Sequence, residues 1–298
     1  MPSFASEIKR EICNVPIKAP CCSVAELAGV VSFAGNIKND KLYIKTEASF
    51  IAKRIYRLAK ICLDIKGKVT ATGSSRKTYK ILLAEGEDIA LVLHKLNIKN
   101  MCADMTVIEK FCCKKAFLRG TFLASGSCND PKKSYHLEIS SNDEAKALWL
   151  KGLLENMNIA CGILTRRNNK VVYIKNSDYI SDIVGYIGAT KAMMEIQHVK
   201  IYKVFKNNII RINNLEGANM SKTTDAAAEQ RTMIRKIQKY IGLDAIDPSL
   251  RELALLRLEN ECSLKELGAM MSKPLSKSGV NHKIKKLYEI AESIKEKE

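Results

Sequence analysis

The stretch "CCSVAELAGVVSFAG", residues 21–35, decides the fold because the chain contains it twice. It returns without a gap as "CCKKAFLRGTFLASG", residues 112–126. A gap-free recurrence of this length indicates an internal duplication, and a duplication sets the architecture of the region around it. The identical positions are Cys21 and Cys112, Cys22 and Cys113, Ala25 and Ala116, Leu27 and Leu118, Gly29 and Gly120, and Gly35 and Gly126.

The same order of predicted elements follows each copy. Alternating apolar and polar residues indicate half-buried strands, and apolar residues at helical spacing indicate helices. Each half therefore has the order αββαββα, and we expect the two halves to pack around a pseudo-twofold axis formed by their first helices. The first copy continues with a strand at 41–48, a helix at 50–63, a strand pair at 67–84 and a helix at 87–98, and the second with a strand at 134–141, a helix at 143–157, a strand pair at 161–176 and a helix at 178–189.

The composition predicts a globular, basic protein. Of the 298 residues, 46% are hydrophobic, which is enough for one large packed domain and a smaller one. The formal net charge of +17 is spread along the chain, and the pI is about 9.4. Such a charge favours a polyanionic partner, with nucleic acid as the first hypothesis, while a merely solvated basic surface is the alternative.

Targeting signals are absent from the sequence itself. The N-terminal stretch "MPSFASEIKREICNVP" has no apolar core of signal-peptide length, and nowhere do about 18 uncharged apolar residues run together. We therefore expect a cytoplasmic protein that has no membrane partner.

The 10 cysteines stand in apolar contexts such as "KICLDI" and "NIACGIL". These contexts favour buried reduced thiols over disulfides. The adjacent pairs Cys21-Cys22 and Cys112-Cys113 raise zinc as an alternative. Because neither pair belongs to a CxxC motif or has a histidine nearby, the sequence favours thiols without a metal, and we expect no cofactor.

The duplicated unit, with its small-residue first helices, resembles the LAGLIDADG homing-endonuclease fold, and the whole chain resembles the WhiA family of bacterial regulators. In active LAGLIDADG enzymes the eighth motif position carries the metal-binding acid, and the equivalent positions here are Ala34 and Ser125. Phosphodiester cleavage on this scaffold needs carboxylates that hold a divalent cation. The resemblance therefore implies a nuclease scaffold without its catalytic ligands and no catalytic residues. Asp40 and Asp130 follow the motif in expected turns and are weak replacements.

The segment 201–245 is expected to contain a basic hairpin and a connector helix. "HVKIYKVFKNNIIRINN", residues 198–214, alternates in the manner of strands on either side of Asn207-Asn208, which suits a turn. A helix is then expected from an N-cap at Ser221 to a stop at Gly242. Its lysines and arginines could contact the phosphates of a nucleic acid, or they could simply keep an exposed linker soluble. The resemblance to the WhiA family includes an Asn-rich stretch here, matched by Asn214, Ala218, Asn219 and Lys222.

The C-terminal stretch 247–294 is predicted to form helix, helix, turn, helix. Pro248 and Ser263 suit helix starts, "SKPLSKS" at 272–278 forms the turn, and the third helix begins near Ser276. This order is typical of a helix-turn-helix reader of DNA, and an ordinary three-helix bundle with a solvated lysine face is the alternative. "SKSGVNHKIKKL" also resembles the C-terminal signature of the WhiA family. The predicted DNA-binding residues are Lys273, Ser276, Lys277, Ser278, Asn281, His282, Lys283, Lys285 and Lys286.

The predicted fold class is α+β, a duplicated αββαββα LAGLIDADG-like domain joined to an all-α helix-turn-helix domain. We expect a LAGLIDADG-like domain at 1–200, with repeats at about 20–106 and 107–197, the connector at 201–245 and the helix-turn-helix domain at 246–298. Specific binding is expected in the last domain. In the first domain Lys38, Lys41 and Lys45 have His136 and Glu138 as their counterparts in the second repeat, so binding there should be weak. His94, His136 and His198 are expected to be structural residues.

The predicted function is sequence-specific binding of double-stranded DNA without nuclease activity. The family resemblance implies a nucleoid-associated transcriptional regulator in sporulation, cell division and chromosome segregation, with a further protein partner on the LAGLIDADG-like domain. One alternative is an active LAGLIDADG-type endonuclease or RNA maturase. Another is a protein-interaction scaffold that the small domain anchors to the chromosome.

Overall fold

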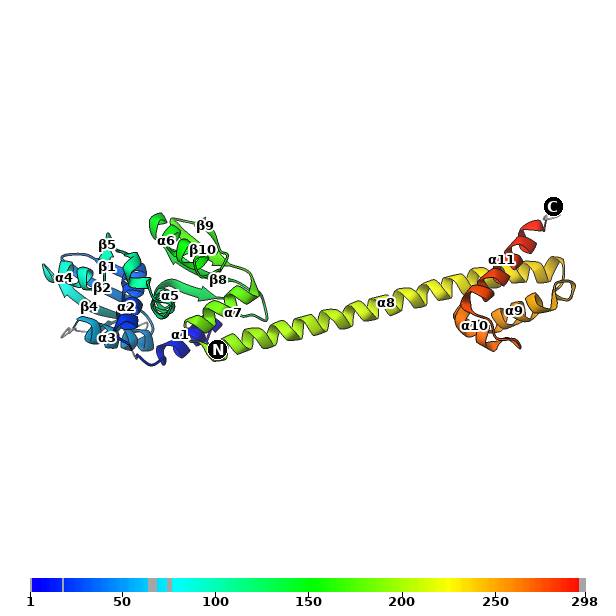
Figure 1. The fold of residues 1–298 in the computed structure, drawn as a ribbon, viewed down its shortest axis with the longest axis horizontal. Coiled ribbons are helices and arrows are strands. Elements are labelled where there is room, and N and C mark those ends of the chain that lie inside the picture. Colours follow the sequence, from blue (N-terminus) through cyan, green and yellow to red (C-terminus); the bar gives the residue numbers. More distant parts are fainter. Residues whose placement is uncertain (1, 18, 64–68, 74–76, 295–298) are drawn as a thin grey trace. The chain divides into compact units, whose positions relative to one another are not determined.

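The structure, a computed structural model, describes residues 2–17, 19–63, 69–73 and 77–294. The chain divides into two compact units, Met1–Lys203 and Val204–Glu298 (Figure 1). Among the described residues, no helix combines the length and apolar content needed to cross a bilayer.

The first unit contains two αββαββα repeats, which confirms the predicted duplication. Each repeat forms one antiparallel sheet, in the orders β1-β2-β4-β3 and β7-β8-β10-β9. The first repeat consists of α2 (Pro20–Ala34), β1 (Gly35–Ile37), β2 (Lys41–Thr46), α3 (Ser49–Leu63), β3 (Val69–Thr72), β4 (Thr78–Glu85) and α4 (Asp88–Lys95). The second consists of α5 (Phe111–Ser125), β7 (Gly126–Cys128), β8 (Leu137–Ser141), α6 (Glu144–Glu155), β9 (Gly162–Arg166), β10 (Asn169–Ile174) and α7 (Ser177–Tyr186). Of the strand pair predicted at 67–84, residues 67, 68 and 74–76 lie outside the described residues.

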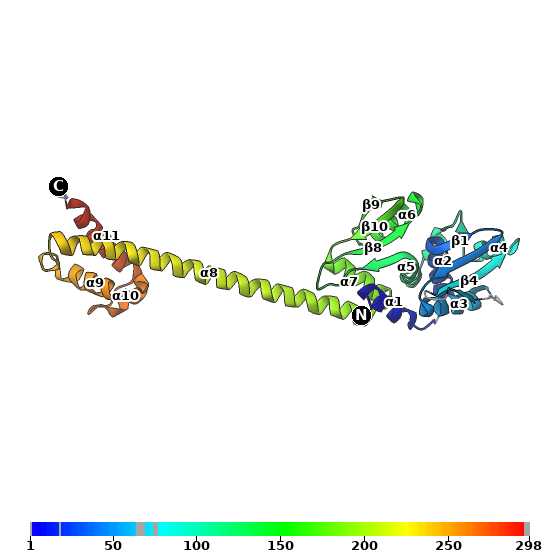
Figure 2. The ribbon, with the colours of Figure 1, turned by 180° about the vertical axis from the view of Figure 1, so that it is seen from behind.

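Helices α2 and α5 pack side by side at the centre of this unit, as both views show (Figures 1 and 2). Their glycines make this possible. A Cβ at Gly29 would come within 3.0 Å of the Phe117 carbonyl oxygen, and one at Gly120 would come still closer to the Glu26 carbonyl oxygen. Real Cβ atoms do not approach backbone so closely, so the glycines of the motif set the distance between the repeats.

Further elements of the first unit were not predicted. They are α1 (Phe4–Cys13), β5 (Ile98–Lys99), β6 (Cys102–Ala103) and the 3₁₀ turn η1 (Met105–Ile108). Helix α1 buries Ile8 and Ile12 in the same apolar core as α2 and α5. The core of this unit is therefore shared by both repeats and by the segments that flank them.

The predicted hairpin around Asn207-Asn208 is wrong. Residues 198–214 lie inside α8 (Thr190–Tyr240), a helix of 51 residues that contributes to both units, and Ser221 is an interior residue rather than an N-cap. β-Branched or aromatic residues alternate here with lysines at a period of two, which favours a strand. This preference for β-structure is weak where no second strand pairs with the segment. The sequence from Thr190 to Glu216 contains neither glycine nor proline, so nothing interrupts a helix there.

The second unit is all-helical, as predicted. It contains the later part of α8, the 3₁₀ turn η2 (Leu243–Ala245), α9 (Pro248–Glu259), α10 (Leu264–Met270) and α11 (Lys277–Ser293). Helix α9 begins at Pro248, and Ser263 forms a capping box with Glu266 at the start of α10. Its core is separate from that of the first unit and consists of residues of all four helices and η2, among them Ile237, Leu253, Leu267 and Leu287.

Candidate nucleic-acid interface

Helix α11 is held by one apolar face and exposes the other. Val280, Ile284 and Leu287 are buried against α9 and α10, because they recur at helical spacing on the inner side. The opposite side presents Asn281 and His282 to solvent. The anchored face fixes how the polar side chains project, and this is what a recognition helix requires.

The predicted binding residues are not equivalent in the structure. Lys273, Ser276, Lys277, Ser278, Asn281, His282, Lys285 and Lys286 are exposed, and most of them lie on the first half of α11 or immediately before it. Farther along the helix, exposed Glu289 and Glu292 reverse the charge. The basic surface is therefore confined to the N-terminal half of α11, which is the half that enters the major groove in helix-turn-helix proteins.

Three of the predicted residues have local partners. Ser276 is the N-cap of α11, where its hydroxyl accepts a hydrogen bond from the Gly279 N–H at 3.3 Å. The hydroxyls of Ser276 and Ser278 lie 2.9 Å apart. Lys283 is half-buried, and its ammonium donates to the Ser249 hydroxyl at the start of α9 at 2.5 Å. Ser249 in turn donates to Asp247, and these hydrogen bonds hold the pKa of the Asp247 carboxyl below its usual value. Lys283 therefore fastens α11 to α9.

A groove of about 560 Å³ lies beside the start of α11. Its wall brings together Asn219 and Lys222 of α8, Lys265 of α10 and Lys277 of α11. Three lysines from three helices thus surround one concave surface that also has an amide. The sequence reading included Lys222 and Lys277 but missed Lys265 and the grouping, because these residues meet only through packing of the helices.

Arg257 is a buried residue in the lining of this groove. The side chain is buried, and its Nη1 donates to the Asn260 and Cys262 carbonyl oxygens at 3.3 and 2.7 Å. Burial lowers the pKa of the Arg257 guanidinium from its ordinary value. Because it also lines the groove, Arg257 adds positive charge to the same surface.

The two positions that the family resemblance predicts to have lost a metal ligand lie at equivalent places in the two repeats. Ala34 is the last residue of α2 and Ser125 is the last residue of α5. Close to the first of them, the buried Lys146 ammonium of α6 donates to the Ser32 carbonyl oxygen at 3.0 Å. Burial lowers the pKa of Lys146. A cation thus occupies the carboxyl end of α2, where the helix dipole favours positive charge.

The two acids downstream of the motif, Asp40 and Asp130, lie beyond the ends of α2 and α5. Asp40 is exposed in the turn between β1 and β2, with a left-handed φ of 51°. The Asp130 carboxylate accepts a hydrogen bond from the Lys132 N–H at 2.9 Å and so closes its own turn. Both acids therefore lie in turns.

The outer faces of the two sheets differ in charge. In the first sheet Lys45 lies opposite Lys80, and both ammonium groups lie over the Tyr43 ring, 5.5 and 4.0 Å from its centroid. In the second sheet Glu138 pairs with His136 at 3.3 Å and with Arg166 at 3.4 Å. The sheet of the first repeat thus presents positive charge. In the sheet of the second repeat, Glu138 offsets the positive charge of the basic side chains beside it. Lys41 is paired with Glu85 at 2.8 Å, and Lys38 is exposed.

Comparisons with known proteins agree with both halves of this architecture. The family model described as the WhiA LAGLIDADG-like domain matches residues 114–206, and that of the WhiA C-terminal HTH domain matches residues 209–291. The chain is 37% identical to the probable cell division protein WhiA of Ruminiclostridium cellulolyticum, with 98% of each chain covered. It is also 37% identical to that of Desulfitobacterium hafniense, with 99% of this chain and 97% of the relative covered. The crystal structure of full-length DUF199/WhiA from Thermatoga maritima is similar with a TM-score of 0.62 and 26% identity, covering 99% of this chain and 100% of that one.

Proposed function

Because the chain belongs to the WhiA family, we propose that it is a sequence-specific DNA-binding protein of cell division that has no nuclease activity. The observation that carries this proposal is α11, whose buried face fixes Asn281 and His282 in solvent beside exposed lysines. Amide and imidazole groups at this position can hydrogen-bond base edges, and lysines can contact phosphates.

The DNA-binding surface comprises Lys273, Ser276, Lys277, Ser278, Asn281, His282, Lys285 and Lys286. Lys283 contributes by holding α11 in place against α9. We add Lys222 and Lys265 to this surface, because they share a groove with Lys277 and would extend the phosphate contacts beyond α11. Asn219 lies in the same wall. We therefore include this part of the Asn-rich stretch in the proposed surface.

The biological role follows from the relatives. The curated relatives are named as probable cell division proteins, and we extend that role to this chain. Sequence-specific binding makes transcriptional regulation the mechanism that we propose, with sporulation and chromosome segregation as the wider processes. The site of action would be the nucleoid in the cytoplasm.

The proposed loss of nuclease activity rests on the ends of α2 and α5. Cleavage by a metal-dependent nuclease needs carboxylates that hold the cation against the scissile phosphate. Ala34 and Ser125 cannot supply them, and the buried Lys146 ammonium beside Ser32 opposes a second cation near the end of α2. The scaffold would then serve to support the protein and to bind partners rather than to cut DNA.

Selection from a random duplex library tests the proposal directly. The full chain is expected to enrich one sequence motif, and the Asn281→Ala/His282→Ala variant is expected to enrich none. Lys151→Ala, a partly exposed lysine on α6 of the first unit, serves as the control and should return the wild-type motif. Enrichment of the same motif by the double variant would exclude α11 as the reading element.

A further inference from the structure

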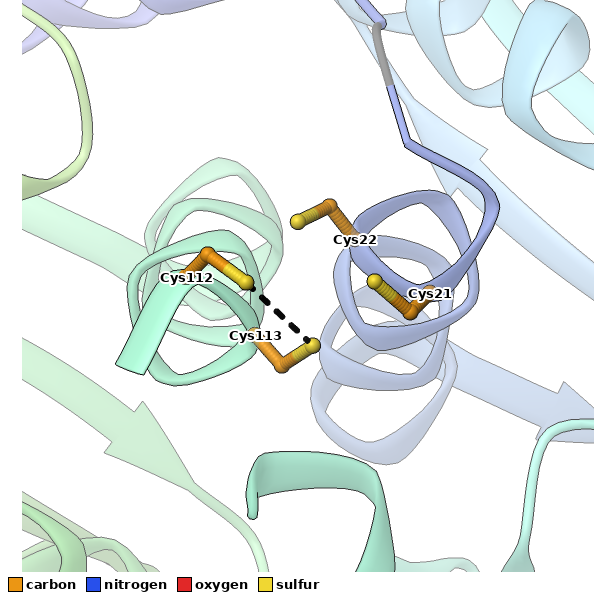
Figure 3. A group of neighbouring side chains, drawn as sticks. All are labelled: Cys21, Cys22, Cys112 and Cys113. Carbon is orange, nitrogen blue, oxygen red and sulfur yellow. Dashed lines mark hydrogen bonds between the residues drawn. The ribbon is translucent and has the colours of Figure 1, made fainter. Parts of the chain in front are cut away.

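The structure brings together four cysteines that stand far apart in the sequence. Cys21 and Cys22 lie in the first turn of α2, and Cys112 and Cys113 lie in the first turn of α5 (Figure 3). Their four sulfur atoms all lie within 4.8 Å of one another. The sequence favoured ordinary thiols because neither pair has the spacing of a zinc motif. Spacing along the chain cannot show that two distant pairs meet in the folded protein.

The convergence is a consequence of the duplication. The two pairs occupy equivalent positions on helices that pack against each other, so the symmetry of the repeats places one pair opposite the other. In Figure 3 the four cysteine side chains extend from the two helix starts toward the space between them. A site made in this way takes two ligands from each repeat.

We infer that these four thiolates form a structural zinc site that joins the two repeats. Zinc in structural sites takes four ligands in a tetrahedron, and four cysteines are a common set. Zn–S bonds of about 2.3 Å place neighbouring sulfur atoms roughly 3.8 Å apart. The Sγ atoms of Cys112 and Cys113 lie 3.9 Å apart, and the limit of 4.8 Å for the whole group requires only small side-chain adjustments.

The surroundings suit a negatively charged metal centre. Binding of one zinc ion by four thiols releases their four protons to solvent and leaves a complex with two net negative charges. Among the described residues, neither helix start has a side-chain cap or an acidic residue in its first turn. The positive ends of two helix dipoles therefore face the thiolates, and the first turns of α2 and α5 place no carboxylate beside them.

A route to the site is also present. A cavity of about 380 Å³ has Cys21 and Cys113 in its wall, together with Lys95 and Lys110. The cysteines are graded in exposure: Cys21 and Cys112 are exposed, Cys22 is intermediate and Cys113 is buried. An ion can thus reach the cluster from solvent. The wall also contains Glu109, so its two lysines leave a net charge of about +1 beside the negatively charged complex.

The site differs in position and purpose from the catalytic metal of the nuclease scaffold. It lies at the amino ends of α2 and α5, whereas Ala34 and Ser125 close the carboxyl ends. Zinc here would link the repeats at the end where the described helix starts have no caps and would stabilise the first unit. The inference is independent of the proposed DNA binding.

Metal analysis of the full chain tests it. Protein produced in zinc-supplemented medium and purified with a non-chelating reductant is expected to contain about one zinc ion per chain by elemental mass spectrometry. Cys21→Ser/Cys112→Ser, which alters the two exposed ligands, should lose that zinc. The matched control is Cys62→Ser/Cys161→Ser, and it should retain the zinc. These two cysteines are partly buried and lie on α3 and just before β9.

Two further measurements separate a structural site from adventitious binding. Cobalt should replace zinc and give the intense visible absorption of a tetrahedral thiolate complex in the wild type only. Removal of the metal should lower the melting temperature of the wild type and leave that of the Cys21→Ser/Cys112→Ser variant unchanged. A zinc-free wild type after reconstitution would overturn the inference. So would equal zinc in both double variants, iron in place of zinc, or disulfides between these cysteines in a non-reducing peptide map.

Discussion

Glu26 of the first repeat and Arg119 of the second form an ion pair across the two central helices, with 3.0 Å between the carboxylate Oε2 and the guanidinium Nη1. The same carboxylate accepts two hydrogen bonds of 2.8 Å from Arg54 on α3. Arg119 also donates to the Ile187 carbonyl oxygen at 2.6 Å. The acid that remains in the motif region is thus fully engaged in holding the repeats together.

Removal of this carboxylate should destabilise the first unit strongly. In Glu26→Ala, the buried Arg54 guanidinium and the nearly buried Arg119 guanidinium remain without their counter-charge. Breaking a buried pair costs about 3–5 kcal/mol, so the free energy of unfolding should fall by that amount. Urea denaturation of the full chain measures it. Glu155→Ala, which removes an exposed pair with Lys151, should cost no more than about 0.5 kcal/mol, and equal losses would contradict this assignment.

Two glycines on different helices should respond to alanine with opposite sign. In Gly120→Ala, the new methyl group would meet the Glu26 carbonyl oxygen, and the helices would have to separate. We expect a loss of about 1–3 kcal/mol of stability, as for other overpacked cores. In Gly152→Ala on α6, the Cβ would meet open space, and alanine should stabilise the helix by about 0.5–1 kcal/mol. Thermal melting of both variants checks the contrast, and a neutral Gly120→Ala would show that the contact is not tight.

The sequence alone predicted the repeats because the pattern of each strand and helix is local and periodic and occurs twice. Residues such as Leu27 and Leu118 recur in equivalent apolar contexts, and the strands and helices that follow have clear periods. The hairpin around Asn207-Asn208 was wrong because a short alternating pattern on a long helix is indistinguishable from a strand until its partner is known. Helix α1 and the β5-β6 pair were not predicted, since each is stabilised by contacts with distant segments.

The candidate site could be predicted only in part for the same reason. The exposure of Asn281 follows from the apolar spacing around Val280 and Ile284 on one helix. The grouping of Lys222 with Lys265 depends on how separate helices pack. The cysteine cluster also depends on packing, but one feature of the sequence indicates it. Identical cysteines near the start of two helices that pair about a pseudo-twofold axis are expected to face each other.

Purified full chain should not cleave DNA in Mg²⁺ or Mn²⁺, because Ala34 and Ser125 cannot bind the metal. Restoring both acids in Ala34→Asp/Ser125→Asp should still give no cleavage, since the buried Lys146 ammonium lies near the end of α2. A supercoiled plasmid library, incubated with each metal and analysed for nicks, measures this. Specific cutting by the wild type that Asp40→Ala or Asp130→Ala abolishes would refute the loss of nuclease activity.

The capping box of α10 should make the second unit sensitive to acid. Hydrogen bonds from Ser263 lower the pKa of the Glu266 carboxyl below its ordinary value of 4.5. A carboxyl with a depressed pKa in the folded state stabilises the fold above its unfolded value, and this contribution is lost as the pH falls through the folded pKa. Stability should therefore decline below about pH 4.5, and this decline should be smaller in Glu266→Gln than in Glu289→Gln. Chemical denaturation at a series of pH values compares the two, and identical pH profiles would exclude this role.

The exposed face of α11 should contain two kinds of DNA contact that fail differently. In the proposed interface Asn281 contacts a base edge, so Asn281→Ala should cost about 1–3 kcal/mol at the specific site and relax the preference at one base pair. Lys285 is placed for phosphates, so Lys285→Ala should weaken binding to all sequences alike and reduce the slope of log affinity against log salt by about 1. Titrations of matched and scrambled duplexes at several salt concentrations separate these effects, with Lys151→Ala on α6 as a charge-matched control. Unchanged site preference in Asn281→Ala would remove this face of α11 from sequence readout, and an equal salt slope in Lys285→Ala and Lys151→Ala would remove Lys285 from the phosphate contacts.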